Sequence, residues 1–335
     1  MAVNTMRSFI KSNGVLAGVL SLFLIIFIVA GACLCIELFV DDTNTAGADK
    51  TFGDEQITVD GKDYNLKSDV STFLVMGLDK YSGDISKESF RNDMQADFLM
   101  LYVFDNLNKK YTVVNINRDT MTDVNILDVA GDKMYTEKKQ IALAHIEGNG
   151  KNSSCRNTAE AVSSLLKGIH VDHYASLTLD SVAVFNDMVG GVEVEIKHDF
   201  TGVDDTLIMG ERVTLMGEHA LNFVKERHGV SNSTNAERME RQKEYLTALR
   251  EKTLSVIKNN DKFIAEAVVK MADYIVSDRS VNQLQDLAEK VNEYEFLGSK
   301  EIKGESKMGK EFIEFYPDEK ALEKLVIELF YTEAK

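Results

Sequence analysis

The sequence predicts an α/β fold: a layered α/β/α domain with a central mixed sheet flanked by helices, preceded by one transmembrane helix. Apolar runs of strand length stand in the first half of the chain, and apolar residues recur at helical spacing in the second half. A third observation, the uncharged run at residues 14–36, predicts the membrane span. As a helix this run would reach ~34 Å, which is enough to cross a hydrocarbon core of ~30 Å.

The charges that flank this run predict its orientation. Arg7 and Lys11 precede it, whereas acidic residues follow it. Because basic flanks stay on the inner side, we expect residues 1–13 in the cytoplasm and the C-terminal domain outside the cell membrane. A cleaved signal peptide is the alternative, and residues 30–33 faintly resemble a lipoprotein box. The length of the run favours an uncleaved signal-anchor.

Composition narrows the function classes. The chain has 38 Lys and Arg against 54 Asp and Glu, a formal net charge of −16. Such a domain would be repelled by a nucleic-acid backbone, so we predict no nucleic-acid partner and expect any phosphate site to be a local basic pocket. Of three cysteines, only Cys155 lies beyond the predicted span. No disulfide can therefore form within the outer domain, and its stability must come from an apolar core.

Strands and helices are mixed along residues 56–335, after a polar stalk at 37–55. The central Asp60-Gly61 predicts a hairpin, and Thr234 with Glu237 forms a capping box that opens a long helix. The remaining patterns predict strands at 72–78, 97–104, 111–117, 192–196 and 312–316, and helices at 158–166, 182–189, 217–228, 234–258, 261–294 and 318–331. We interpret 70–250 as the core of one domain and 251–335 as a helical C-terminal extension.

Charged residues stand at the ends of the three predicted buried strands. Asp79 ends the first strand, Asp97 begins the second and Arg118 follows the third. Ligands usually dock at strand ends in α/β sheets. Two carboxylates there could hold a hard cation, and the arginine could meet a phosphate with two hydrogen bonds. Aspartates that merely mark turns would give the same pattern, so both interpretations remain open on spacing alone.

A second group of polar residues lies later in the chain: Lys225, Arg227, Arg238, Arg241 and Gln242. The last three are spaced i, i+3, i+4 and would share one helix face. Only a bend at 229–233 could bring them together with the first two. A solvated face of salt bridges, with Glu237 four residues before Arg241, explains the pattern equally well.

Eight short segments stand in a fixed order: FLVMGLD at 73–79, QADFLML at 95–101, INRDT at 116–120, DHY at 172–174, VGGVEV at 189–194, GEHAL at 217–221, FVKERH at 223–228 and AERMERQ at 236–242. Together they resemble the LytR-CpsA-Psr family of membrane-anchored cell-wall glycopolymer transferases. The resemblance covers about residues 70–250. The segment beyond 250 carries no motif that can be assigned.

The resemblance implies a phosphotransferase of cell-wall biogenesis. Such enzymes move a glycopolymer, for example teichoic acid or capsular polysaccharide, from a polyprenyl-pyrophosphate carrier to peptidoglycan. Mg²⁺, or Mn²⁺ in its place, lies at the pyrophosphate. A non-catalytic receptor or scaffold for lipid-linked wall polymers, and a polyprenyl-pyrophosphate hydrolase, remain as alternatives.

By position, the resemblance assigns Asp79 and Asp97 to the metal and, together with Arg118, to catalysis. The residues expected to hold phosphate are Arg118, Arg227, Arg238 and Gln242, with Arg241 and Lys225 beside them. Two positions depart from the family pattern, which has Pro where Asn117 stands and Arg where Lys225 stands. Lysine keeps the charge but lacks the planar fork of arginine, which leaves the role of Lys225 open.

Overall fold

The computed structural model describes residues 55–78, 93–226, 228–232, 235–260, 262–271, 274–280, 283–284, 287, 290, 293–310 and 312–334. The predicted span at 14–36, most of the stalk, Asp79, Arg227 and the capping residue Thr234 lie outside this part of the chain. Over the described ranges, no helix is both long and apolar enough to cross a membrane.

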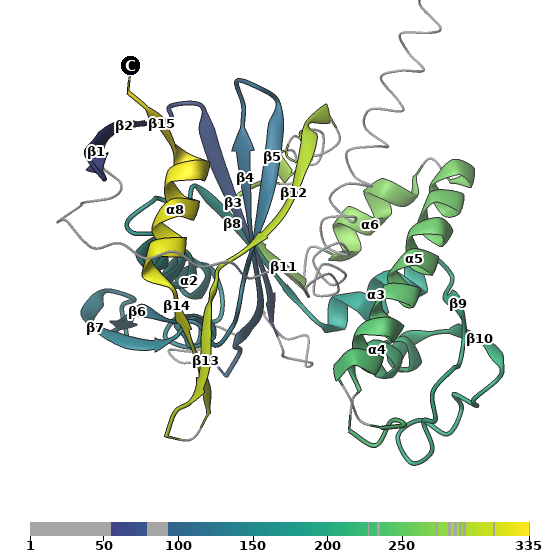
Figure 1. Cartoon of the computed structure of the whole chain (residues 1–335). Coiled ribbons are helices and arrows are strands. Elements are labelled where there is room, and N and C mark those ends of the chain that lie inside the picture. Colours follow the sequence, from purple (N-terminus) through teal and green to yellow (C-terminus); the bar gives the residue numbers. More distant parts are fainter. Residues whose placement is uncertain are drawn as a thin grey trace, which may run out of the picture.

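Six strands form the central sheet, in the order β11-β8-β3-β4-β5-β12 (Figure 1). β3, β4 and β5 are joined antiparallel, whereas β8 runs parallel to β3 and β12 runs parallel to β5. The predicted mixed sheet is therefore confirmed. The strands are β3 (Val70–Leu78), β4 (Ala96–Asp105), β5 (Lys110–Ile116), β8 (His173–Thr178), β11 (Ile275–Ser277) and β12 (Glu295–Glu301).

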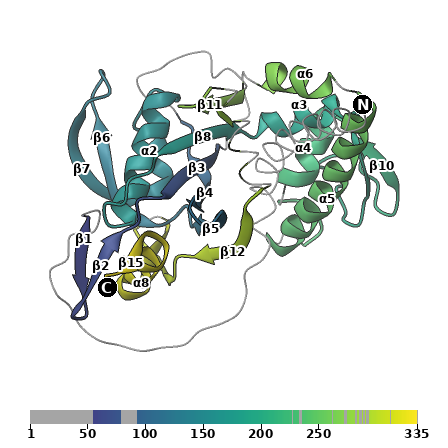
Figure 2. The same ribbon diagram turned by 90° about the horizontal axis from the view of Figure 1, so that it is seen from above.

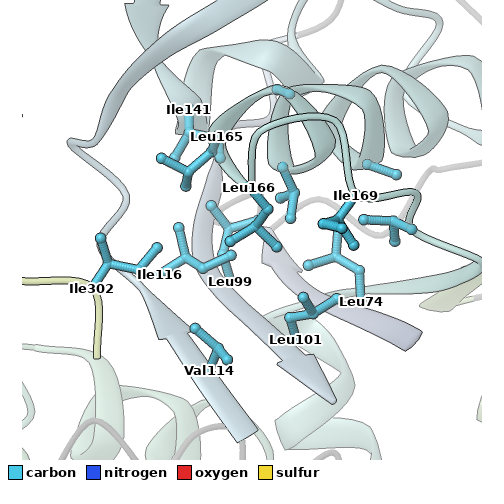
Figure 3. Packing of buried hydrophobic residues seen from close by; sticks show 14 of the residues in the cluster. Leu74, Leu99, Leu101, Val114, Ile116, Ile141, Leu165, Leu166, Ile169 and Ile302 are labelled. Carbon is cyan, nitrogen blue, oxygen red and sulfur yellow. The ribbon is translucent and has the colours of Figure 1, made fainter. Parts of the chain in front are cut away.

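The central strands are apolar on both faces because each face is covered. In β3, Leu74 and Met76 belong to the core beneath α2 (Asn152–Leu165) and α8 (Glu319–Phe330), whereas Phe73 and Val75 belong to the core on the opposite face. This is the period-two alternation of a strand with apolar residues at every position. Figure 3 shows the first core, in which side chains of the strands meet those of α2 and the segment that follows it.

A second core lies beside the sheet and is built mainly from helices (Figure 2). It contains α3 (Asp180–Met188), α4 (Gly217–Lys225), α5 (Asn235–Asn259), α6 (Phe263–Met271) and the hairpin β9 (Val192–Glu195)–β10 (Arg212–Leu215). Gly191 lets the chain leave α3, because its φ is +80° and a Cβ there would lie 2.8 Å from the Leu215 carbonyl oxygen. The helix predicted at 182–189 thus ends within one residue of the predicted position.

The hairpin predicted around Asp60-Gly61 is also present. It joins β1 (Gln56–Val59) to β2 (Lys62–Leu66), and β15 (Tyr331–Glu333) pairs with β2 on the other side. Asp60 and Gly61 have φ values of +51° and +76°. Two successive positive values are the requirement of a type I′ turn, which Asp-Gly meets at low steric cost.

The segment beyond residue 250 differs from the predicted helical extension. It contains α6 and α8, but β11 and β12 form the two edges of the central sheet, and β13 (Gly304–Met308) pairs with β14 (Ile313–Pro317) as a hairpin. The prediction missed β12 because an edge strand with exposed side chains shows no apolar alternation. The hairpin of β6 (Met121–Leu127) and β7 (Lys133–Gln140) was missed for a similar reason, since β7 is largely exposed.

Candidate functional site

The register of the sheet brings several predicted site residues to one edge. Leu78 at the end of β3 lies opposite Ala96 at the start of β4 and opposite Thr178 at the end of β8. Ile116 at the end of β5 pairs with Leu99 of β4. Residues that follow β3, β5 and β8, or that open β4, therefore share this edge.

Arg118 is the centre of the site. Its Nη1 donates a hydrogen bond to Oδ1 of Asp97, and its Nη2 donates to Oε1 of Gln95. Its Nε lies 3.7 Å from Oδ1 of Asp119. The side chains of Arg118 and Asp97 are each about one-third exposed, at 37% and 34%. The guanidinium is thus held on two sides by oxygen atoms while part of it still faces solvent.

The turn that carries Arg118 is fixed by the short 3-10 helix η2 (Ile141–His145). The amide of Ala142 donates to the Arg118 carbonyl oxygen at 3.1 Å, and the amide of Ile141 donates to that of Thr120 at 2.8 Å. Asn117 closes the turn from within, because its side-chain oxygen accepts the amide of Asp119 at 2.9 Å. The family pattern has proline at this position. Here a hydrogen bond to the asparagine side chain stabilises the turn in place of the proline ring.

Asp119 is the second carboxylate beside Arg118. Its Oδ1 accepts a hydrogen bond from Nε2 of Gln140 at 3.1 Å, and its main-chain oxygen accepts the amide of Phe315 at 2.8 Å. Burial raises the pKa of the Asp119 carboxyl, and the positive charge of Arg118 opposes that rise. Asp119 thus contributes a carboxylate and a backbone anchor to the turn on which Arg118 stands.

The same 3-10 helix also holds the segment that leads into β4. The ring of His145 is fully buried, and its Nδ1 lies 2.9 Å from the carbonyl oxygen of Met94. A carbonyl only accepts, so Nδ1 carries the proton and Nε2 faces Sγ of Cys155 at 3.8 Å. Burial lowers the pKa of His145 to about 4, which keeps the ring neutral at physiological pH. One short helix therefore sets Arg118 relative to Gln95 and Asp97.

Cys155 is a free cysteine with a buried thiol. Its Sγ lies 3.2 Å from Oγ of Ser176, and burial raises its pKa to about 12. A thiol that stays protonated at neutral pH is a poor nucleophile.

Lys225 and Asp180 approach the same edge from the helical side. Asp180 opens α3 two residues after the end of β8, and Lys225 ends α4. Burial raises the pKa of the Asp180 carboxyl, and the positive charge of Lys225 opposes that rise. Nζ of Lys225 also lies 3.2 Å from Glu226. Among the described residues, the hydroxyl of Thr178 at the end of β8 is buried without a hydrogen-bond partner.

The predicted residues of α5 divide into different environments. Arg238 is half-buried. Arg241 is 1% exposed, and its Nε donates to the Phe223 carbonyl oxygen at 2.9 Å, its Nη2 donates to that of Glu226, and its guanidinium lies over the ring of Phe200. These contacts join α5 to the end of α4 and do not favour the predicted phosphate contact of Arg241. The side chain of Gln242 lies outside the described part of the structure.

The donors that could hold a metal are oxygen atoms. In the described ranges no group of three or more His, Cys, Asp or Glu is arranged to bind a metal ion. Asp97, with the amide oxygen of Gln95 on the same guanidinium, offers one carboxylate and one neutral oxygen. Mg²⁺ commonly takes only one or two carboxylates and completes its shell with water and substrate phosphates. The donor set fits such a cation and does not fit zinc.

Several residues of the site were not assigned a role from the sequence. Gln95 and Asp119 stood inside recognised segments but had no separate signal. Asp180 had the position of an acidic residue at a helix start, which is common for capping alone. His145 and Thr178 could not have been found, because their roles depend on burial and on partners distant in the sequence.

Comparison with known proteins identifies the family. The model of the LytR_cpsA_psr family matches residues 36–330. The chain belongs to the LytR-CpsA-Psr family. The resemblance found in eight segments is thereby confirmed, and it extends well beyond residue 250 into the part that had no assignable motif.

Two curated relatives carry names that concern the cell wall. The cell wall biosynthesis protein LcpA of Corynebacterium glutamicum is 30% identical over 178 residues, which are 48% of this chain and 33% of LcpA. The polyisoprenyl-teichoic acid–peptidoglycan teichoic acid transferase TagV of Bacillus subtilis is 29% identical over 212 residues, which are 61% of this chain and 49% of TagV. The chain thus spans between a third and a half of the length of these relatives.

Solved structures agree on the fold. A protein of Streptococcus agalactiae superposes with a TM-score of 0.56 at 18% identity, over 78% of this chain and 87% of that protein. At this identity the likeness concerns the fold alone, and it includes the mixed sheet with its helices.

Proposed function

We propose that this LytR-CpsA-Psr protein is a phosphotransferase that moves a glycopolymer from a polyprenyl-pyrophosphate carrier to peptidoglycan. The observation that carries the proposal is the guanidinium of Arg118, held by Asp97 and Gln95 at a sheet edge where strand ends converge. An arginine fixed in this way presents its remaining N–H groups in a planar fork that matches a phosphate. The names of LcpA and TagV support the cell-wall substrate.

The reaction exchanges one phosphorus–oxygen bond for another. A hydroxyl of the acceptor attacks the phosphorus that carries the polymer, a bond from that oxygen to phosphorus forms, and the bond to the polyprenyl phosphate oxygen breaks. Arg118 and Arg238 hold the negative charge that develops on the leaving phosphate. Asp97 receives the proton of the attacking hydroxyl. The products are a polymer linked to peptidoglycan through one phosphate and free polyprenyl phosphate.

The remaining charged residues position the substrate. Arg227 and Gln242 complete the phosphate contacts, and Lys225 brings a further positive charge from the end of α4. Asp79 and Asp97 would hold Mg²⁺ or Mn²⁺, which supplies positive charge against the pyrophosphate oxygens. Because the chain as a whole is strongly acidic, this local collection of positive groups is what makes phosphate binding possible.

We further propose that residues 14–36 anchor the protein in the cell membrane with the domain outside. A lipid carrier presents its pyrophosphate at the membrane surface, so an enzyme tethered there meets its substrate in two dimensions. Protease added to protoplasts should then digest the chain after residue 41 and spare residues 1–12. Complete protection of the domain in accessible protoplasts would contradict this topology.

A transfer assay tests the function. The full chain is reconstituted in vesicles with a polyprenyl-pyrophosphate-linked saccharide and peptidoglycan fragments, and the products are analysed by mass. The proposal expects saccharide joined to peptidoglycan by a phosphodiester, together with released polyprenyl phosphate. Release of saccharide phosphate without attachment would indicate a hydrolase, and binding without turnover would indicate a receptor.

A further inference from the structure

The β13–β14 hairpin projects beyond the edge of the sheet that carries Arg118. β12 runs parallel to β5, and the chain continues from its last residue, Glu301, almost directly into β13. β5 ends at Ile116, two residues before Arg118, so the hairpin leaves the sheet in the direction of the site (Figure 1).

The second strand of the hairpin, β14, is fixed to the site by two hydrogen bonds along its length. The amide of Phe315 donates to the Asp119 carbonyl oxygen at 2.8 Å, and Nε2 of Gln140 donates to the Ile313 carbonyl oxygen at 2.7 Å. Thr120 forms an isolated parallel bridge with Phe315. Because these bonds involve neighbours of Arg118, the direction of the hairpin is set relative to the phosphate-binding group.

The end of the hairpin is apolar and exposed. Met308 is 74% exposed, Phe312 67% and Ile313 51%, and every residue of β13 is exposed. We call Met308, Phe312 and Ile313 the apolar tip. Charges of both signs flank it, with Lys307 and Lys310 beside Glu305 and Glu314, and Lys307 pairs with Glu305 at 3.0 Å. Exposed apolar side chains that gather on a projecting element, with charged residues around them, are typical of a surface that docks on a membrane or on a partner.

We propose that the apolar tip docks on the membrane surface, at the boundary between headgroups and acyl chains. The sequence itself argues for this occupant. If residues 14–36 anchor the chain, only 18 residues separate them from Glu55, and an extended segment of that length spans at most ~60 Å. The domain would then stay close to lipid at all times.

The chemistry of the tip favours lipid over glycan. Methionine, phenylalanine and isoleucine side chains offer no hydrogen-bond groups, which a surface that selects a sugar polymer requires. Exposed apolar side chains on a projecting element match the apolar face of interfacial membrane segments, which enters the headgroup boundary by roughly 5–10 Å. The proposal rests on the proposed anchor, and its consequence for catalysis, namely that the site faces the lipid-linked pyrophosphate, rests on the proposed function.

The protein contains no tryptophan, so a single introduced one reports on its own position. The Phe312→Trp variant of the full chain is reconstituted in vesicles of phosphatidylglycerol and phosphatidylcholine, the latter brominated in the upper part of its acyl chains. We expect a blue-shifted emission and strong loss of intensity compared with unbrominated vesicles. Met308→Trp serves as a second probe if the first variant does not fold.

Leu107→Trp is the matched control. Leu107 is an exposed apolar residue as well, at 74%, but it lies in the turn between β4 and β5 at the opposite end of the sheet. Its emission should be the same in brominated and unbrominated vesicles. Equal quenching of the control and the tip probe, or quenching of neither, would overturn the proposal. A tip probe that responds to added peptidoglycan fragments and not to brominated lipid would overturn it in favour of a glycan surface.

The fluorescence experiment needs no substrate and no turnover. It therefore separates a failure of the docking proposal from a failure of the proposed transferase activity. If both hold, Phe312→Ser should lower the rate on substrate carried in vesicles and leave unchanged the rate on a water-soluble analogue with a short prenyl chain. An equal loss on both substrates would contradict a role for membrane docking in catalysis.

Discussion

Arg118 donates a hydrogen bond to Asp97 across the ends of two antiparallel strands, β5 and β4. A second bond from the same guanidinium reaches Gln95, which stands two residues before Asp97. The plane of the guanidinium is thereby fixed by protein groups. A side chain that is already oriented loses less conformational entropy when it binds a phosphate, which is the physical basis of preorganised charge stabilisation.

This geometry predicts that Arg118→Lys loses most of the transfer activity. Lysine keeps the positive charge, but it cannot contact Asp97, Gln95 and a phosphate at the same time through one planar group. Loss of a charge-assisted hydrogen bond should cost about 1.5–3 kcal/mol, or roughly ten- to hundredfold in rate or affinity. Steady-state transfer and prenyl-pyrophosphate binding measure the effect.

Arg212→Lys is the control for that variant. Arg212 is 69% exposed and forms a surface ion pair with Glu193 at 3.0 Å, so its replacement should change activity and melting temperature little. Near-normal turnover of Arg118→Lys would defeat the phosphate-clamp model and shift weight to the receptor alternative.

Arg241 should respond differently, because it is buried and donates to two carbonyl oxygens at the end of α4. Arg241→Met keeps much of the volume but leaves those carbonyls without a donor. Each buried polar group left unsatisfied costs about 1–3 kcal/mol, so the free energy of unfolding should fall by about that amount or more. Urea denaturation measures it. An unchanged stability with lost phosphate binding would restore the role first predicted from the sequence.

The sequence predicted the parts of the fold that are marked by local pattern. β3, β4 and β5 are runs buried on both faces, and Asp60-Gly61 needs no tertiary context to form its turn. The edge strands β11 and β12 had no such mark. β12 pairs with β5 across a sequence separation of about 185 residues, and its exposed side chains are those of a surface segment. The interpretation of 251–335 as a helical extension missed these strands for that reason, whereas the strand predicted at 312–316 and the helix predicted at 318–331 are present as β14 and α8.

The site was predictable only in part, for a related cause. Strand ends suggested Asp97 and Arg118, and the structure joins these two residues directly. The helical spacing of Arg238, Arg241 and Gln242 could not tell which side faces the core. Arg241 lies inside it, where its guanidinium donates to carbonyl oxygens at the end of α4. Burial and long-range partners are properties of the tertiary structure, and no local pattern contains them.

His145 predicts a loss of stability in acid. Its folded-state pKa of about 4 lies below the ordinary value of 6.5, so the unfolded chain binds a proton that the folded protein rejects. The stabilisation that the neutral, buried ring of His145 provides is complete above about pH 6.5 and is lost progressively as the pH falls toward 4. A shift of this size corresponds to about 3 kcal/mol.

Denaturation by urea at a series of pH values tests this expectation in the wild type and in His145→Asn. Asparagine can donate to the Met94 carbonyl oxygen but does not titrate, so the variant should lose less stability in acid than the wild type does. Near neutral pH the variant should be the less stable of the two proteins. Parallel pH profiles of the two proteins would show that His145 does not contribute to the acid sensitivity.

The metal assignment predicts that Asp97→Ala abolishes the activity that depends on Mg²⁺. The carboxylate of Asp97 accepts a hydrogen bond from Arg118, and the family resemblance places this carboxylate at the metal. Alanine offers no ligand in its place. The side chain is about one-third exposed, so the fold should persist and the melting temperature should change little.

Asp93→Ala is the matched control, because Asp93 lies on the same segment before β4, is exposed, and stands outside the family pattern. Transfer rates are measured across a Mg²⁺ titration and again with chelator. We expect the wild type and Asp93→Ala to respond to the metal and Asp97→Ala to remain inactive at every concentration. If Asp97→Ala kept full activity in the presence of chelator, Asp97 would be neither a metal ligand nor the proton acceptor. The carboxylate of Asp119, whose pKa is raised by burial, would then be the next candidate for the proton acceptor.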